Sequence, residues 1–317
     1  MKTYRLGFIL STIILIFSMI FPVHGEEGIL DPDTTLYEYQ QTKDLVSFVH
    51  EAAELFSEKG EKVFPDFRKK GSKWFNEQRY LFIYDLKGFS VFHPVNPELE
   101  GKNLINLEDL DGKPVIKYLI ETVTGKGEPS GWIHYLWCEP GEIFPRWKSS
   151  YVLKVEDPSG NEYVIGSGIY NMRPERQFIV DAVDSAVELI REKGKEAFKD
   201  VGTKSSRFVF RDTYIFVLSM DGKAVVDPAF PSEEGARGVK VGRELIDFRD
   251  AVGKYAVREM IDKLKRSDSA WVLYRWPKIG ETTPSKKVAY VKKVKIDGEE
   301  YIVGSDIFLA NPIWMKL

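Results

Sequence analysis

Two sets of aromatic and charged residues are the side chains best suited to binding a small molecule. In each set a Tyr and a Trp stand two positions apart, and a Lys and a second Tyr follow at the same distances. The first set is Tyr135, Trp137, Lys148 and Tyr151, and the second is Tyr274, Trp276, Lys287 and Tyr290. Tyr and Trp join an apolar ring to one polar edge, a Lys ammonium can pair with a carboxylate, and a Tyr hydroxyl can donate a hydrogen bond. This composition indicates two pockets for small organic molecules.

The two sets belong to a duplication that runs through the chain. Trp132 precedes its match Trp271 by 139 positions (271 − 132 = 139), and Lys148 precedes Lys287 by the same number (287 − 148 = 139). After the next turn the offset becomes 138, because Tyr163 matches Tyr301 (301 − 163 = 138). Turns tolerate changes of length better than strands do, so the pattern predicts two homologous domains.

One difference separates the two sets. The strand YVIGSGIY carries Gly166 and Gly168 on one face, where small residues would leave room for a guest. In the second copy Asp306 takes the position of Gly168. Asp306 would suit an amine, with Lys287 left to hold an acid group of the same ligand. We therefore expect the first half to prefer a plain carboxylate or a neutral molecule, and the second an amine or amino acid.

Each of these residues also has a structural interpretation. Large aromatic residues at strand spacing are more often core residues than ligand contacts. Lys148 and Lys287 would equally suit solvated strand edges, where lysine discourages association between sheets. Asp306 could pair with Lys287 or Arg275 instead of a ligand. His93 fits a structural place in a turn.

Catalysis, metal binding and nucleic-acid binding find little support. The histidines after residue 25 are His50, His93 and His134, none of them at the spacing of metal ligands. Gly166-Ser167-Gly168 resembles a nucleophile motif, but it lies within a predicted strand and recurs as Gly304-Ser305-Asp306. A net charge of −3 gives no basic footprint for nucleic acid, and the single Cys138 excludes an internal disulfide. We expect no enzyme activity, no cofactor and no metal.

Hydrophobic periodicity and turn residues outline the elements that would position these side chains. The first half is expected to contain a helix over Leu45–Phe56, strands over Tyr80–Tyr84 and Phe89–His93, a short helix ending at Val123, and strands over Trp132–Trp137 and Tyr163–Tyr170. The second half repeats the order, with a helix over Phe178–Ile190 and strands over Tyr214–Leu218, Trp271–Trp276 and Tyr301–Phe308. This order predicts an α+β fold in which each half has an antiparallel sheet with its helices on one side.

The N-terminus reads as a secretory signal. Lys2 and Arg5 precede the apolar run Leu6–Phe21, and Val23-His24-Gly25 ends in a small residue. An uncleaved membrane anchor is the alternative, because the run is nearly long enough to span a bilayer. We therefore expect a signal peptide at 1–25, a first module at 26–172 and a second at 173–317, in a periplasmic or secreted protein.

The ordered motifs resemble the Cache family of extracytoplasmic sensor domains. They comprise a helix, YLFIYDLKG, His-Pro, GKNLINLEDLDGKP, the G-W-I-x-Y-x-W strand, a spaced lysine and YVIGSGIY, and most recur in the second half. The resemblance implies two PAS-like modules in tandem, each with a long N-terminal helix behind an antiparallel sheet whose other face cradles a ligand. It also implies that aromatic and charged residues at the positions named above contact that ligand.

These observations lead to an expected function. We expect an extracytoplasmic sensor that binds an organic carboxylate, an amino acid or an amine. No signalling domain follows the second repeat, so the partner that receives the signal is expected to be a membrane receptor or a histidine kinase. The alternative is an envelope interaction or scaffold module with vestigial pockets, and a hydrolase is a weaker third possibility.

Overall fold

The computed structural model describes residues 29, 31–76, 79–125, 129–227, 242–277 and 283–309. The signal peptide expected at 1–25 lies outside these residues. None of the helices in the described part of the chain is both long and apolar enough to span a membrane.

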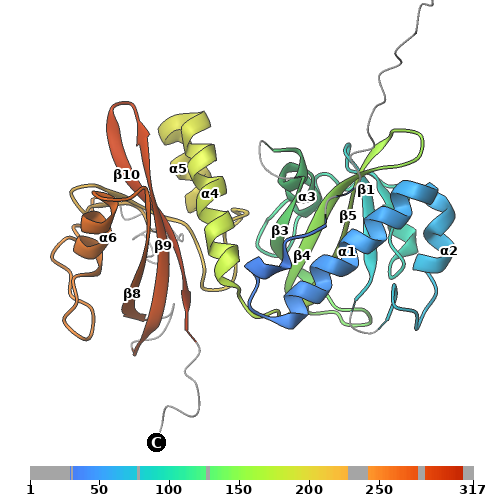
Figure 1. The fold of residues 1–317 in the computed structure, drawn as a ribbon, viewed down its shortest axis with the longest axis horizontal. Coiled ribbons are helices and arrows are strands. Elements are labelled where there is room, and N and C mark those ends of the chain that lie inside the picture. The colour runs from blue at the N-terminus through green and yellow to red at the C-terminus, as the bar shows by residue number, and fades with distance from the viewer. Residues whose placement is uncertain are drawn as a thin grey trace, which may run out of the picture.

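Two α+β modules follow one another along the chain (Figure 1). The first contains α1 (Gln40–Lys59), α2 (Phe64–Phe67), β1 (Leu81–Asp85), β2 (Ser90–Phe92), α3 (Val115–Thr124), β3 (Ser130–Cys138), β4 (Pro145–Glu156) and β5 (Glu162–Tyr170). The second contains α4 (Arg176–Lys193), α5 (Ala197–Gly202), β6 (Phe216–Ser219), β7 (Ala224–Val226), α6 (Ala256–Leu264), β8 (Ser269–Pro277), β9 (Pro284–Ile296) and β10 (Glu299–Phe308). Short 3-10 turns cover Thr34–Leu36, Gly60–Val63, Pro97–Leu99 and Gly194–Glu196.

The two sheets have the same topology, which confirms the expected fold class. The first has the order β2-β1-β5-β4-β3 and the second β7-β6-β10-β9-β8, and all pairs of neighbours are antiparallel. Matched residues also share register, because Trp132 lies opposite Tyr151 and Trp271 lies opposite Tyr290. The segments around Tyr80–Tyr84 and Tyr214–Leu218 lie in the equivalent strands β1 and β6.

A glycine with positive φ ends each long helix. Gly60 (φ 58°) follows α1 and donates its N–H to the carbonyl of Phe56, and Gly194 (φ 63°) follows α4 and donates to Ile190. Glycine adopts this conformation without the steric penalty of a Cβ atom, so it stops a helix at a defined residue.

Helices cover both faces of each sheet, so the expectation of helices on one side is wrong. In the first module α1 packs on the face that carries Leu81, Ile83 and Tyr151. The shorter α3 packs on the opposite face, against Phe82 and Tyr135. The second module repeats this arrangement with α4 and α6. The sequence shows that both helices are amphipathic, but helical periodicity alone does not say which face of the sheet each one covers.

The connection between the modules is held by Glu175. Its side chain is buried, and its carboxylate accepts hydrogen bonds from the backbone N–H groups of Glu38 and Tyr39 and from the hydroxyl of Thr42. The residue just before α4 thereby holds the backbone that leads into α1. Figure 1 shows α4 lying between the second sheet and the first module.

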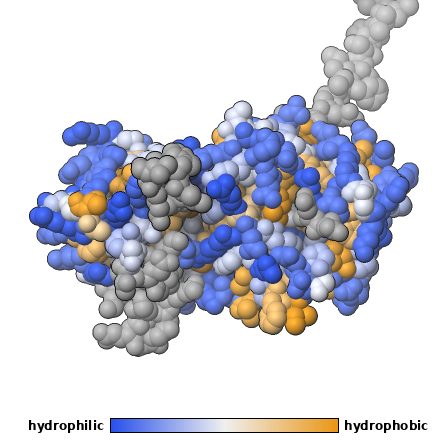
Figure 2. Space-filling model, turned by 90° about the horizontal axis from the view of Figure 1, so that it is seen from below, coloured by the Kyte–Doolittle hydropathy of each residue, from blue (hydrophilic) through white to orange (hydrophobic). Residues whose placement is uncertain are grey.

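The exterior carries few hydrophobic side chains. The face seen in Figure 2 is mostly hydrophilic, with hydrophobic residues gathered in a few places. Leu110, Ile143 and Phe144 are the most exposed of the large hydrophobic residues in the described ranges. Ile143 and Phe144 stand between β3 and β4, at the tip of a hairpin.

Candidate functional site

Three of the predicted residues of the first module meet on the face of the sheet covered by α3. Tyr135 packs with α3 in the hydrophobic cluster of this face, and Trp137, two positions along β3, packs against the same cluster. Lys148 lies on β4 directly opposite Tyr135, and Tyr170 of β5 lies on its other side. The site is therefore assembled from the three consecutive strands that follow α3.

Lys148 is the most informative residue of this site. It is 1% exposed and lies on β4, an inner strand, so the alternative of a solvated edge lysine is wrong. Its ammonium donates to the hydroxyl of Tyr80 over 2.8 Å and lies 4.0 Å from the centre of the same ring. Burial lowers the pKa of Lys148 to about 7, because the charged form loses its hydration. No acidic side chain in the described ranges forms an ion pair with it.

Further polar groups surround the ammonium of Lys148. Tyr135 and Ser150 share a hydrogen bond of 2.9 Å between their hydroxyls, and Tyr170 Oη lies 3.3 Å from Tyr80 Oη. His93 is buried with its ring centre 5.4 Å from that of Tyr80. Burial, followed by the nearby charge of Lys148, lowers the pKa of His93 to about 3, so its imidazole is neutral. The result is a buried cluster with one cation and several hydroxyl groups.

The second module contains the same framework with a different charge pattern. Lys287 is 1% exposed on the inner strand β9, so it too is not an edge lysine. Its Nζ lies 2.6 Å from Oδ1 of Asp306. The hydroxyl of Tyr274 donates to Oδ2 of the same carboxylate. Of the alternatives left open by the sequence, the ion pair between Asp306 and Lys287 is therefore the one observed.

A small cavity of about 50 Å³ lies beside this ion pair. Three of the predicted residues line it, namely Tyr274, Trp276 and Asp306. It is also lined by residues that sequence reasoning did not select: Tyr214, Phe216, Leu218, Asp227, Leu245, Phe248, Asp250, Ala256, Val257 and Met260. Half of these come from β6 and α6, so the cavity lies between the sheet and the shorter helix.

A family model for the Cache domain matches the chain twice, over residues 69–198 and 188–307. The chain belongs to the Cache domain family. Cache domains are extracytoplasmic sensor domains, found in chemotaxis receptors and histidine kinases, that bind small ligands. The two matches agree with the duplication seen in the sequence and in the sheets.

Among curated proteins, the chain is similar to the methyl-accepting chemotaxis protein McpP of Pseudomonas putida and to the sensor histidine kinase MctS of Rhizobium johnstonii. Each is 31% identical over 96 residues, which cover 30% of this chain. The chain covers only 17% of the length of McpP and 20% of that of MctS. The similarity therefore concerns a sensor module and not the whole receptor or kinase.

Two solved structures are also similar over one module. A periplasmic sensor domain of a chemotaxis protein is 32% identical, with 35% of this chain and 72% of that chain covered and a TM-score of 0.31. A Cache chemosensory domain, solved for its recognition of carboxylic acids, is 31% identical, with 35% and 71% covered and a TM-score of 0.30.

Two predicted site residues of these Cache modules lie on the wrong face of the sheet for the site. Tyr151 packs on the α1 side, where its hydroxyl lies 3.2 Å from Nε2 of His50. Tyr290 lies on the α4 side and packs against Trp271, with ring centres 5.1 Å apart. Alternate residues of a strand point to opposite faces, so a Tyr three positions after the lysine cannot share its pocket.

The glycines of β5 do not leave room for a guest, which corrects a second expectation. A Cβ atom at Gly168 would stand 2.8 Å from Cε of Lys148 and closer still to Oγ of Ser150. A Cβ atom at Gly166 would stand 2.8 Å from the ring of Phe82. The space above each glycine is filled by the protein's own side chains. Ser167, between them, donates to the carbonyl of Tyr80 over 2.7 Å, as expected of a structural serine.

Tyr80 and His93 are residues of the candidate site that sequence reasoning missed. His93 was expected to be structural, and its Nδ1 indeed accepts a hydrogen bond from the backbone N–H of Asn96 in a turn. Its ring also lies near that of Tyr80, beside Lys148. The repeat itself could have shown this, because Tyr80 begins the motif YLFIYDLKG and Tyr214 begins the matching motif YIFVLSMDG.

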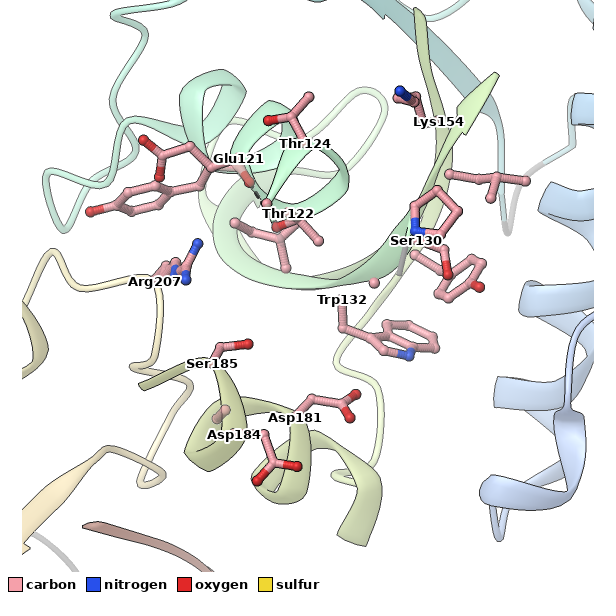
Figure 3. A pocket seen from close by; sticks show the side chains of 18 of the residues that line it. Glu121, Thr122, Thr124, Ser130, Trp132, Lys154, Asp181, Asp184, Ser185 and Arg207 are labelled. Atoms are coloured by element: carbon pink, nitrogen blue, oxygen red, sulfur yellow. Dashed lines mark hydrogen bonds between the residues drawn. The ribbon is translucent and has the colours of Figure 1, made fainter. Parts of the chain in front are cut away.

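A wide cleft of about 2570 Å³ opens elsewhere, between the two modules. Figure 3 shows Asp181, Asp184 and Ser185 of α4 on one side, with Ser130 and Trp132 of β3 across from them. Burial raises the pKa of Asp181 to about 6. The cleft is lined by charges of both signs, and its width and mixed lining make it a poorer candidate for a small ligand than the face under α3. No group of His, Cys, Asp or Glu in the described ranges could hold a metal ion.

Proposed function

We infer that this protein is an extracytoplasmic sensor whose first module binds a small organic carboxylate at Lys148. In this function a membrane receptor or histidine kinase would receive the signal. Residues 1–25 would direct export, which would place both modules where such a receptor meets its ligands. The observation that carries the proposal is the buried Lys148 ammonium.

The energetics of Lys148 favour an anionic ligand. A buried charge is costly unless a partner of opposite sign and hydrogen bonds compensate for it. Here the compensation consists of the Tyr80 hydroxyl and the faces of aromatic rings, which stabilise a cation only modestly. A ligand carboxylate would supply the missing anion. The empty module already bears the free-energy cost of burying the Lys148 ammonium. The ion pair with a ligand carboxylate would therefore add to the affinity without paying that cost again.

The groups around Lys148 suit a short carboxylic acid. The hydroxyls of Tyr80 and Tyr135 could donate to carboxylate oxygens, since burial raises the pKa of both phenols well above the usual value and keeps them protonated. Phe82 and Trp137 offer apolar surface for a short hydrocarbon chain. The neutral His93 adds no second positive charge, so a monocarboxylate matches the site better than a dicarboxylate.

The scaffold alternative is disfavoured by the same residue. A pocket without a ligand gains nothing from a buried ammonium, and an apolar residue of similar volume would be less costly there. A vestigial module would therefore be expected to have lost Lys148, and this module has it.

Isothermal titration calorimetry of the purified protein with acetate, propionate, pyruvate and lactate tests the proposal. We expect one of these acids to bind, and Lys148→Met to abolish the binding. Lys154→Met is the matched control, because Lys154 lies on the same strand but pairs with Glu162 at the surface. A ligand at ~100 times its Kd should also stabilise the fold by ~2.7 kcal/mol, visible as a rise in Tm. Binding that survives Lys148→Met, or no binding by any organic acid, would refute the proposal.

A further inference from the structure

The two Cache modules place the same three residues around one point. Lys148 and Lys287 lie on β4 and β9, the fourth strands of their modules, and Tyr135 and Tyr274 lie directly opposite them. A tyrosine just before the first strand contacts the lysine in both modules, since Lys148 Nζ lies 4.0 Å from the ring centre of Tyr80 and Lys287 Nζ lies 5.0 Å from that of Tyr214. The framework that would recognise a carboxylate is therefore present twice.

Two adjacent positions beside the lysine differ between the modules in a related way. The modules also differ where Tyr170 is replaced by Phe308 and His93 by Asp227. Ser150 lies opposite Gly168 in the first sheet, and Ala289 lies opposite Asp306 in the second. In the first module Ser150 fills the space above Gly168 and hydrogen-bonds with Tyr135. In the second, the smaller Ala289 leaves that space to the side chain of Asp306.

Asp306 makes the contacts that a bound carboxylate would make. One oxygen lies 2.6 Å from Nζ of Lys287, and the other accepts a hydrogen bond from the hydroxyl of Tyr274. The side chains of Lys287 and Asp306 are each 2% exposed. A ligand carboxylate could reach Lys287 only by displacing Asp306, which would leave a buried carboxylate without its cation, a strongly destabilising change.

The space that remains is small. The cavity beside Asp306 measures about 50 Å³, whereas pockets for organic ligands typically measure ~300–1,000 Å³. One water molecule needs ~10–15 Å³ of such volume, so this cavity suits a few waters and is far smaller than a typical pocket for an organic ligand.

We propose that Asp306 is a built-in carboxylate that takes, in the second module, the place of the ligand in the first. Only the first module then binds an organic anion, and the second is held permanently with its lysine neutralised. The pair Gly168 and Ser150, exchanged for Asp306 and Ala289, determines whether a module binds an anion. This inference rests on the proposed function, because it takes Lys148 as the lysine that receives the carboxylate. It replaces the expectation that Asp306 binds the amine of an amino acid, since the Asp306 carboxylate already pairs with Lys287.

Calorimetric stoichiometry with propionate as the probe tests this inference. The wild-type protein should bind one equivalent, and Lys148→Met none. Adding Asp306→Ala, or the pair Asp306→Gly and Ala289→Ser, to Lys148→Met should restore one equivalent, because either change frees Lys287 and vacates the space of the Asp306 carboxylate. Asp306→Ala keeps a Cβ atom at this position, so it tests the inference even if the glycine variant fails to fold. Lys148→Met with Ala289→Ser alone is the control and should not bind.

The outcomes separate this inference from the proposed function. Two equivalents bound by the wild type, or one retained by Lys148→Met, would show that Lys287 accepts anions despite Asp306 and would overturn the inference. A folded Lys148→Met/Asp306→Ala protein that binds no propionate, together with a wild type that binds it, would also overturn the inference and leave the proposed function intact. A wild type that binds no organic acid would overturn the proposed function.

Discussion

Lys287 and Asp306 form an ion pair inside the second module, with 2.6 Å between Nζ and Oδ1. The equivalent lysine of the first module, Lys148, has a tyrosine hydroxyl at 2.8 Å in place of the carboxylate. Both lysines are 1% exposed and lie on equivalent strands. The same substitution at the two positions should therefore have opposite effects on stability.

Replacement of each lysine by methionine tests this contrast. Lys287→Met leaves Asp306 buried without its cation and should lower the free energy of unfolding by about 3–5 kcal/mol. Lys148→Met removes a buried charge that lacks an anion and should leave the stability unchanged or increase it. Urea denaturation at pH 7 measures both, and Lys154→Met serves as a surface control. Equal losses of stability in the two variants would contradict the conclusion that Asp306 compensates the charge of Lys287 while no carboxylate compensates that of Lys148.

Carboxylate binding should depend on pH through Lys148. Burial lowers the pKa of its ammonium to about 7, and a bound anion would raise that pKa again. Affinity should therefore be greatest below pH 7, while the ligand is still ionised, and should fall by up to about tenfold per pH unit above it. Calorimetry at pH 8 in phosphate and in Tris should give different apparent enthalpies, because binding takes up a proton. Identical enthalpies in the two buffers would show that Lys148 does not change its protonation.

The tyrosines on the two faces of the first sheet should respond differently to removal of the hydroxyl. Tyr80→Phe removes the acceptor of the Lys148 hydrogen bond and should weaken carboxylate binding roughly fivefold to tenfold, about 1–1.4 kcal/mol. Tyr151→Phe removes a hydrogen bond with His50 on the α1 side. It should cost about 0.5–1.5 kcal/mol of stability and leave the affinity within twofold. Titration and thermal unfolding of both variants check this, and a large affinity loss in Tyr151→Phe would count against the location of the site.

Glu175 should be important for the start of α1. Glu175→Ala removes the acceptor of the backbone N–H groups of Glu38 and Tyr39. Glu175 is only 1% exposed, so water cannot easily replace it. We expect the free energy of unfolding to fall by about 1–3 kcal/mol. Hydrogen exchange at the first turn of α1 should become faster. Arg176→Ala is the control, because Arg176 pairs with Glu38 at the surface and such pairs contribute about 0–1 kcal/mol. An unchanged rate of hydrogen exchange in Glu175→Ala would argue against this role of Glu175.

The sequence by itself determined the features that depend on local pattern. The repeat offsets, the turn glycines and the alternation of apolar residues led to two modules of one α+β fold with matched strands. Local pattern also put Tyr135 and Trp137 on one face with Lys148 nearby, and Tyr274 and Trp276 likewise. These assignments succeeded because strand periodicity and turn chemistry involve residues close together in the chain.

Only the tertiary structure decided which distant residues meet. Tyr80 reaches Lys148 because β1 and β4 both flank β5, an order that no local pattern contains. The same order buries both lysines on inner strands. The helices α1 and α3 pack on opposite faces of the first sheet, and only the structure shows which of them covers the face of Lys148. Whether a buried charge is compensated depends on partners brought within a few ångströms by the fold. For that reason the sequence shows Gly168 and Asp306 at matched positions, but only the structure shows what each of them does to its lysine.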